Sequence, residues 1–321
     1  SGKTATMTHR IAYLIEQGAS PYNILAVTFT NKAAAEMRER VERLGVSCRG
    51  MWILTFHSMS LRILREYYEA AGYQKNFVVY DTVDQKALLK SILKDQNIDS
   101  KEYPVNYLGA IISKEKEADR GPEEYLEREG GNFKAKKIYE VYKDYQGRLK
   151  KNNAMDFDDL LRNALHVLRD YPVILEEYRD RFRYVMVDEY QDTNEAQDLL
   201  FTYLSNGHNL FTVGDIKQSI YRFRLAMPNI FNDKRKHYAL YDEKDSNISS
   251  KIILDKNFRS SKGICDYVNF VFSHLMSEKV GEINYDKQDW LNYGAKYEEN
   301  DAVCAQINII AVSYTHLRAH E

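Results

Sequence analysis

The sequence is poor in cysteine and contains no long apolar run. Its three cysteines, Cys48, Cys265 and Cys304, are widely spaced and form no CxxC pair, which argues against a zinc site or a disulfide framework. No segment approaches the roughly 18 apolar residues that a membrane-spanning helix requires. No basic segment followed by an apolar stretch, the mark of a secretory signal, opens the chain. These absences predict a globular, cytoplasmic protein without a membrane partner.

The chain also lacks an excess of positive charge. Its 321 residues carry a formal net charge of −2, although 29% of them are charged. Because nucleic-acid phosphates normally require clustered lysine and arginine, this balance predicts that any contact with nucleic acid is local. The basic clusters at 134–137 and 234–236 are more typical of solvated faces than of binding patches.

Short apolar runs alternate with amphipathic stretches near the start of the chain. Strands are expected at Ile24–Thr28 and Met51–Thr55, and helices at Lys32–Leu44 and His57–Ala71. This βαβ rhythm predicts an α/β fold with a mostly parallel sheet covered by helices on both faces. Further strands are expected at Tyr184–Val187, Leu210–Val213 and Ile252–Leu254.

Helical periodicity and charged segments dominate between about residues 61 and 182. This change of pattern predicts a mainly helical insertion within the sheet-containing domain. The strands on either side of it end beside polar residues. Since ligands of open α/β sheets bind at the carboxyl ends of the strands, those polar residues are the first candidates for chemistry.

The first four residues, Ser1, Gly2, Lys3 and Thr4, match the second half of the phosphate-binding loop GxxxxGK[ST]. In such a loop the backbone N–H groups and the positive end of the following helix hold phosphates. Lys3 is then expected to reach the β and γ phosphates of a nucleotide, and Thr4 to coordinate Mg²⁺. The tetrapeptide alone is a weak signal, since short motifs have a high false-positive rate.

A more specific pattern is the apolar run 184–187 followed by Asp188 and Glu189. Neighbouring side chains at the end of a strand point to opposite sides, which predicts that Asp188 holds the Mg²⁺ shell while Glu189 orients and deprotonates the attacking water. A polar turn after a strand is the alternative. The GKT segment in the same chain favours a Mg²⁺-nucleotide site, because both halves of such a site are then present.

Two later segments add amide, aromatic and basic side chains. In 213–224, Gln218 is a candidate sensor of the γ-phosphate, and Tyr221 and Phe223 are candidate stacking platforms for unpaired bases, although aromatic residues at this spacing are equally typical of a core. In 257–260, Arg259 is a candidate arginine finger. A lone arginine after a strand is ordinarily a surface residue, so this prediction depends on the other motifs in the same chain.

Taken together these segments resemble the UvrD-like superfamily 1 helicases, which are 3′-to-5′ DNA motors built from two RecA-like domains with inserted subdomains. The resemblance covers nearly all of residues 1–311. Its motifs, in order, are SGKT at 1–4, AVTFTNKAAAEM at 26–37, TFHS at 55–58, VDEYQDTN at 187–194, GDIKQSIYRFR at 214–224 and NFRS at 257–260.

The resemblance implies functional residues beyond those already discussed. It places Phe29, Asn31, Lys32 and His57 along a track for single-stranded DNA and Arg10 near the nucleotide. Asn31 can also cap the helix that follows it. Residues 209–306 are closer to the helicase subunit of bacterial helicase–nuclease complexes, whereas MDFDDLL at 155–161 is closer to stand-alone repair helicases. A nuclease-complex partner subunit is therefore one possible partner.

The resemblance also implies a division of the chain. We expect residues 1–60 and 183–258 to form a RecA-like P-loop motor domain, 61–182 its helical insertion, and 259–311 the start of a second motor domain. Residues 312–321 break the preceding pattern and are expected to be a non-native tail. The first glycine of the phosphate-binding loop and the later motor motifs are absent, so we expect a fragment that does not unwind DNA by itself.

The predicted function is ATP-dependent movement on single-stranded DNA and separation of the duplex at single-strand/double-strand junctions, in repair or recombination, with ATP and Mg²⁺ as cofactors. Two alternatives stay open. One is a P-loop ATPase switch that does not depend on DNA. The other is a non-catalytic DNA-binding module in which a degenerate nucleotide site only supports the fold.

Overall fold

A computed structural model describes residues 2–219, 227–244, 249–277 and 284–296. Residues Gly2–Lys251 form one compact unit, and the described residues from Ile252 onward belong to another. Serine 1, Tyr221, Phe223 and the tail at 312–321 lie outside the described residues. Within the described part of the chain, no helix combines the length and apolar character needed to cross a membrane.

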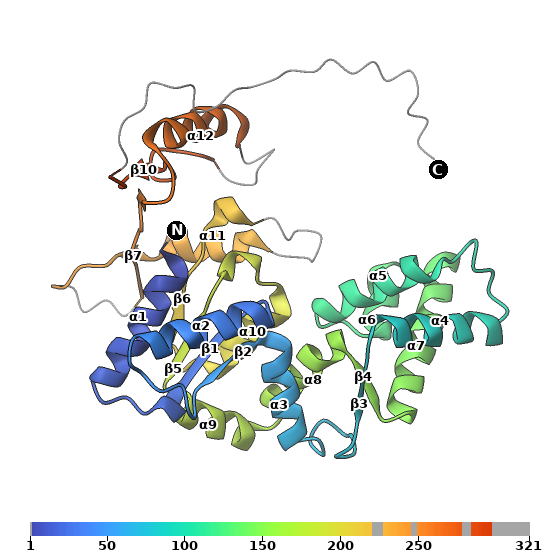
Figure 1. Cartoon of the computed structure of the whole chain (residues 1–321). Coiled ribbons are helices and arrows are strands. Elements are labelled where there is room, and N and C mark those ends of the chain that lie inside the picture. The colour runs from blue at the N-terminus through green and yellow to red at the C-terminus, as the bar shows by residue number, and fades with distance from the viewer. Residues whose placement is uncertain (1, 220–226, 245–248, 278–283, 297–321) are drawn as a thin grey trace. The chain divides into compact units, whose positions relative to one another are not determined.

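A four-stranded parallel sheet forms the centre of the first unit (Figure 1). The strands are β1 (Ile24–Thr28), β2 (Trp52–Thr55), β5 (Tyr184–Val187) and β6 (Leu210–Thr212), in the spatial order β2-β1-β5-β6. In the register, Ala26 pairs with Ile53 on one side and with Met186 on the other. The α/β class and the parallel sheet predicted from the sequence are confirmed, as are the bounds of β1 and β5.

The helices, in chain order, are α1 (Lys3–Glu16), α2 (Asn31–Arg43), α3 (Phe56–Glu66), α4 (Thr82–Asp95), α5 (Val105–Glu117), α6 (Pro122–Arg128), α7 (Phe133–Lys151), α8 (Phe157–Asp170), α9 (Pro172–Arg181), α10 (Glu195–Leu204), α11 (Pro228–His237) and α12 (Lys262–Leu275). Short 3-10 helices are η1 (Pro21–Asn23), η2 (Tyr190–Asp192) and η3 (Ile216–Gln218). Minor strands are β3 (Val78–Tyr80), β4 (Ala154–Asp156), β7 (Ala239–Leu240), β8 (Ser250–Lys251), β9 (Lys256–Asn257) and β10 (Asn292–Tyr293).

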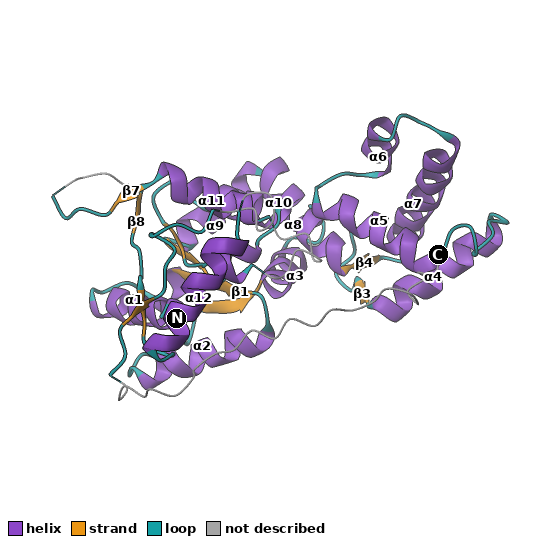
Figure 2. Ribbon diagram, turned by 90° about the horizontal axis from the view of Figure 1, so that it is seen from above, coloured by secondary structure: helices purple, strands orange, loops and turns teal. Residues whose placement is uncertain are grey.

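Helices cover both faces of the sheet because alternate residues of each strand point to opposite sides. On β1, Ile24 and Ala26 enter a core made with α1 and α2, whereas Leu25 and Val27 enter a second core with α3, α8, α9 and α10. Figure 2 shows the strands between α2 on one side and α9 and α10 on the other. The two cores pack on opposite faces of the sheet, and polar loops follow its carboxyl edge.

A third hydrophobic core lies within the helical segment of the chain. It is built from α4, α5, α6 and α7, and it includes Leu89, Ile112, Tyr142 and Ala154. The parallel pair β3–β4 connects this helical group to the sheet. Helices α8 and α9, which follow it in sequence, pack instead against the face of the sheet that α3 covers.

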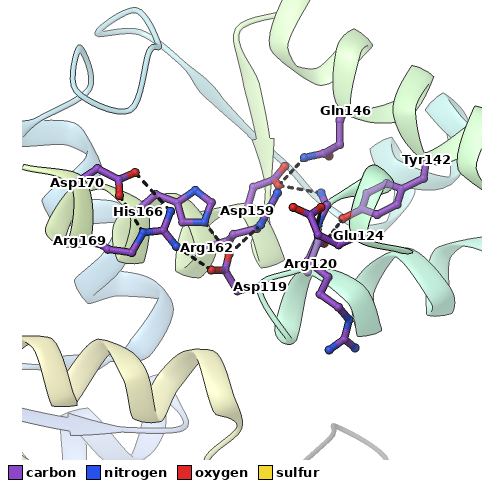
Figure 3. Close-up of polar contacts among 12 residues, drawn as sticks. Asp119, Arg120, Glu124, Tyr142, Gln146, Asp159, Arg162, His166, Arg169 and Asp170 are labelled. Carbon is purple, nitrogen blue, oxygen red and sulfur yellow. Dashed lines mark hydrogen bonds and ion pairs between the residues drawn. The ribbon is translucent and has the colours of Figure 1, made fainter. Parts of the chain in front are cut away.

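Polar side chains join the helical group to α8 (Figure 3). Lys116 of α5 is fully buried and contacts Asp156 Oδ2 at 2.6 Å and Asp159 Oδ1 at 2.9 Å. Two residues after the end of α5, Asp119 contacts Arg162 at 3.0 Å and His166 at 2.6 Å, both on α8. Buried charges persist only where partners satisfy them, so this junction is held by paired ions rather than by apolar packing alone.

Three local predictions are wrong. Residues Ile252–Leu254 form no strand, and their side chains are between 42% and 68% exposed. Helix α3 ends at Glu66 rather than at residue 71. The cap of α2 is Thr30, whose Oγ1 accepts a hydrogen bond from the N–H of Ala33, so Asn31 is the first helical residue and not the cap.

Candidate functional site

The carboxyl ends of all four parallel strands lie at one edge of the sheet, where α/β proteins bind ligands. Asp188 and Glu189 follow β5, and the segment 213–219 follows β6. Helices α2 and α3 begin directly after β1 and β2 at the same edge. The topology therefore brings together segments that are far apart in the sequence, as the predicted site requires.

The start of α1 joins this edge through two side-chain contacts. Thr4 Oγ1 donates a hydrogen bond to Asp188 Oδ2 at 3.0 Å, and Lys3 Nζ donates one to Gln218 Oε1 at 3.1 Å. Gly2 occupies the cap position, so no side chain at that position accepts from the first-turn N–H groups. Such a helix end offers backbone donors and the positive end of the helix dipole to an anion.

The two acidic residues after β5 are separated by an unusual backbone turn. Asp188 is 3% exposed, and its Oδ1 accepts a hydrogen bond from the N–H of Glu189 at 3.0 Å. Glu189 has φ 53° and ψ 40°, in the left-handed region that non-glycine residues rarely occupy. The strand geometry assumed for the two residues is therefore wrong, since β5 ends at Val187 and a left-handed turn follows.

Burial is the main influence on both carboxyl groups. It raises the pKa of Asp188, against the hydrogen bonds from Thr4 and from the Glu189 N–H and the positive charge of Lys3. Burial, and then the negative charge of Asp188, also raise the pKa of Glu189. Raised carboxyl pKa values are typical of groups that accept or donate protons in a reaction, and they accord with a general base at position 189.

Two residues that the sequence analysis did not predict, Asp215 and Gln191, complete the hydrogen-bond network around Gln218. Asp215 Oδ2 accepts a hydrogen bond from Gln218 Nε2 at 2.9 Å, and its N–H donates to Gln191 Oε1 at 2.9 Å. Gly214 leaves room for this contact, since a Cβ there would lie 2.8 Å from Gln191 Oε1. The spacing of three residues between Asp215 and Gln218 was the signal available in the sequence.

The oxygens of Thr4 and Asp188 fit a magnesium ion that also binds a nucleotide. Mg²⁺ prefers hard oxygen ligands and is usually held by one or two protein groups together with phosphates and waters. Among the described residues no three His, Cys, Asp or Glu side chains form a cage of their own for a metal. A hydroxyl and a carboxylate beside an uncapped helix start match that shared mode of binding.

The candidate DNA-binding residues lie at the same edge but in different settings. Asn31 and Lys32 are exposed in the first turn of α2. Phe29 is half-buried, and its ring packs on Phe56 with a centroid distance of 4.9 Å. His57, in the first turn of α3, meets the half-exposed ring of Phe157 edge-on at 5.7 Å.

The structure gives other contacts for two further predicted residues. Arg10 lies two turns along α1, and its guanidinium carbon is 4.5 Å from the ring centroid of Phe211 on β6. Arg259 belongs to the second unit, where its N–H donates to Asn257 Oδ1 at 2.8 Å. Of the other predicted residues, Ser1, Tyr221 and Phe223 are not described.

Comparisons with known proteins show the family. The model of the UvrD/REP helicase N-terminal domain matches residues 1–239. The chain is 44% identical over 284 residues to the ATP-dependent DNA helicase PcrA of Staphylococcus epidermidis, and 45% identical over 283 residues to that of Bacillus subtilis. Each match covers 87% of this chain and 37% of the relative, so the chain spans little more than a third of the relatives' length. The chain therefore belongs to the UvrD/REP helicase family.

Proposed function

We propose that this chain is part of an ATP-dependent DNA helicase that couples ATP hydrolysis to 3′-to-5′ movement on single-stranded DNA, in repair or recombination. One observation carries the proposal. The start of α1 and the ends of β5 and β6 converge through the contacts of Thr4 with Asp188 and of Lys3 with Gln218. These four residues come from three distant segments, and each has the chemistry that a Mg²⁺-nucleotide site requires.

Each residue has a role that its position supports. The N–H groups at the start of α1 and Lys3 bind phosphates, while Thr4 and Asp188 would hold Mg²⁺. The bound ion would neutralise charge on the phosphates. Glu189, half-buried beside Asp188, accepts the proton of the attacking water, and Gln218 orients groups near the terminal phosphate. The raised pKa of Glu189 favours this assignment, because a stronger base accepts a proton more readily.

The DNA-binding role rests on residues at the same edge of the sheet. We assign Asn31 and Lys32 to backbone contacts with single-stranded DNA, because both are exposed at the start of α2, where a phosphate is also favoured. Phe29 and His57 are assigned to the same track. Tyr221 and Phe223 are proposed as base-stacking residues on their sequence alone. The substrate class is single-stranded DNA and its junctions with duplex.

The domain division remains part of the proposal. The separate core of α4–α7 supports a helical insertion, and the parallel sheet supports a RecA-like motor domain from residues 1–60 and 183–258. We assign 259–311 to a second motor domain and Arg259 to transition-state stabilisation. The likeness of 209–306 to the helicase subunit of helicase–nuclease complexes supports a partner subunit of that kind. A cytoplasmic location is also part of the proposal.

The test is ATP turnover with and without single-stranded DNA. It is measured on this chain and on a chimera in which residues 1–239 replace the matching region of the Bacillus subtilis relative. Binding of a fluorescent ATP analogue is titrated in parallel, with Lys3→Ala and Glu189→Gln as matched variants. We expect Lys3→Ala to weaken nucleotide binding, and Glu189→Gln to bind nucleotide but lose DNA-stimulated turnover.

Other outcomes select the alternatives. Turnover that is indifferent to DNA, yet lost in Glu189→Gln, would identify a nucleotide switch. DNA binding without detectable nucleotide binding, in both the chain and the chimera, would identify a DNA-binding module and overturn the proposal.

A further inference from the structure

Tyr190 follows Glu189 directly, and its side chain is completely buried. Its hydroxyl donates a hydrogen bond to Asp198 Oδ1 on α10 and accepts one from Lys234 Nζ on α11. Lys234 Nζ also contacts Asp198 Oδ1 at 2.9 Å and lies 4.5 Å from the centroid of the Tyr190 ring. We call these three residues the Tyr190 triad. It was not foreseen, since the basic cluster at 234–236 was expected to be a solvated face.

The backbone next to the triad is strained. A left-handed conformation at a non-glycine residue is unfavourable and persists only where the surroundings enforce it. At Glu189 the N–H donates to Asp188 Oδ1, and the carbonyl oxygen accepts from the N–H of Asp192 at 2.9 Å. The N–H of Tyr190 donates to the carbonyl oxygen of Val213 at 3.0 Å. Tyr190 is thus the first anchored residue after the turn.

Helix α11 packs against the short helix η2 that follows this turn. No residue of α11 is fully buried. Its ring contact is that of Phe231, which meets Tyr190 edge-on at a centroid distance of 5.8 Å. Gly214 is needed at this point, because a Cβ there would lie 2.9 Å from the Phe231 ring. The N–H of Met227, just before the helix, donates to the carbonyl oxygen of Thr193 at 3.0 Å.

We propose that Lys234 and Asp198 are positioning residues, which fix the Tyr190 side chain and thereby the backbone turn that aims the Glu189 carboxylate. The inference deepens the proposed function and rests on it for the role of Glu189. Hydrogen bonds between charged partners and a buried hydroxyl are stronger than neutral ones. The ring is enclosed and the hydroxyl is held by α10 and α11, so the Tyr190 side chain constrains the turn before it.

The first experiment measures amide hydrogen exchange in the whole ligand-free chain. Lys234→Met keeps the length of the side chain and removes its charge and donors. We expect it to raise the exchange rates of the Tyr190 and Asp192 amides about tenfold, the loss expected for hydrogen bonds to charged groups. Lys236→Met, on an exposed position of the same helix, should leave both rates unchanged. Lys234→Arg should restore most of the protection.

Tyr190→Phe and Asp198→Asn test whether faster exchange reflects loss of the triad rather than a general loss of folding. Both retain the shape of the side chain, and both should raise exchange at the same two amides while the core amides of β1 remain protected. If Lys234→Met, Tyr190→Phe and Asp198→Asn all exchange at these amides like the unsubstituted chain, the triad does not position the turn and the proposal is wrong.

The second experiment separates positioning from binding. In the protein used for ATP turnover, Lys234→Met and Tyr190→Phe should lower kcat about tenfold and leave the KM for ATP within about twofold, since a misplaced base slows chemistry more than binding. An unchanged kcat would overturn the link to Glu189. If the unsubstituted protein neither binds nor hydrolyses ATP, the proposed function fails, whereas exchange at Tyr190 still decides whether the triad holds the turn.

Discussion

The hydroxyl of Thr4 donates a hydrogen bond of 3.0 Å to Oδ2 of Asp188, although the two residues are 184 positions apart in the sequence. This contact joins the start of α1 to the end of β5. It places a neutral oxygen and a charged oxygen beside each other at the edge of the sheet where the helix dipole is positive. The pair is therefore the most direct structural support for a shared cation and phosphate site.

The Thr4 hydroxyl can be tested by substitutions that differ in one group. Thr4→Val removes the hydroxyl and keeps the shape, and we expect it to weaken binding of a Mg²⁺-ATP analogue about tenfold, the loss of one hydrogen bond to a charged group. Thr4→Ser retains the hydroxyl and should bind within about twofold of the unsubstituted chain. Fluorescence titration at fixed Mg²⁺ measures both. Equal affinities for the valine and serine variants would contradict this role of the hydroxyl.

The raised pKa of Glu189 has a consequence for stability. Burial, and then the charge of Asp188, place the folded-state pKa of Glu189 above its ordinary value. A carboxyl group with a raised folded-state pKa contributes its stability below the unfolded pKa and loses it as pH rises through the folded pKa. At neutral pH, ionised Glu189 therefore lowers the free energy of unfolding of the ligand-free chain.

Glu189→Gln should accordingly stabilise the ligand-free chain at pH 7. We expect its Tm to rise by about 2 °C, and the difference to disappear near pH 4, where the native carboxyl group is protonated as well. Differential scanning calorimetry at both pH values measures the effect. Glu39→Gln, on the exposed face of α2, is the matched control and should change little. A Tm at pH 7 equal to or below that of the unsubstituted chain would show that the negative charge of Glu189 does not destabilise the folded chain.

Parts of the fold and of the site could be predicted because local sequence determines them. β1 and β5 are short apolar runs between turn residues, and the structure buries all five residues of β1. The run Ile252–Leu254 has the same local character but pairs with no strand, because apolar composition does not provide a neighbour to pair with. Its failure as a strand is a tertiary effect.

The details that position the chemistry were harder to predict. The left-handed turn at Glu189 is followed by a hydrogen bond from the Tyr190 N–H to Val213, which comes directly after the adjacent strand β6. Lys234 is one of three consecutive basic residues, and only its place on α11 directs it to Tyr190. The acids and the GKT segment could be found from residue type and spacing. The supporting contacts depend on which elements the fold brings together.

The buried lysine between α5 and α8 provides a test of the junction with the helical group. Lys116 is completely buried between Asp156 and Asp159, and Tyr145 donates a hydrogen bond to Asp156 at 2.9 Å. Lys116→Met would leave two carboxylates buried without their counter-charge. We expect a loss of about 3 to 5 kcal/mol in the free energy of unfolding, measured with urea.

The exposed neighbour Lys114 is the matched control for this change. Lys114→Met should alter stability by less than about 0.5 kcal/mol, as for most surface substitutions. Adding Asp159→Asn to Lys116→Met removes one unpaired charge and should recover part of the loss. If Lys116→Met is no more destabilising than Lys114→Met, the ion cluster does not hold the junction.

Asp119 gives the second test of the junction, with a defined dependence on pH. Burial raises the pKa of its carboxyl group, but the hydrogen bond and charge of His166 and the contacts with Arg162 outweigh burial and bring the pKa below the ordinary value of 3.8. A lowered folded-state pKa contributes stability above the unfolded pKa, and this stability is lost as pH falls through the folded pKa.

Asp119→Asn should therefore destabilise the chain at pH 7 by about 2 kcal/mol. The difference in the free energy of unfolding between the variant and the unsubstituted chain should become smaller as pH falls below 3.8. Urea unfolding across this range measures the difference, with Asp180→Asn as an exposed control. A difference that stays constant with pH would mean that Asp119 acts through its shape and not through its charge.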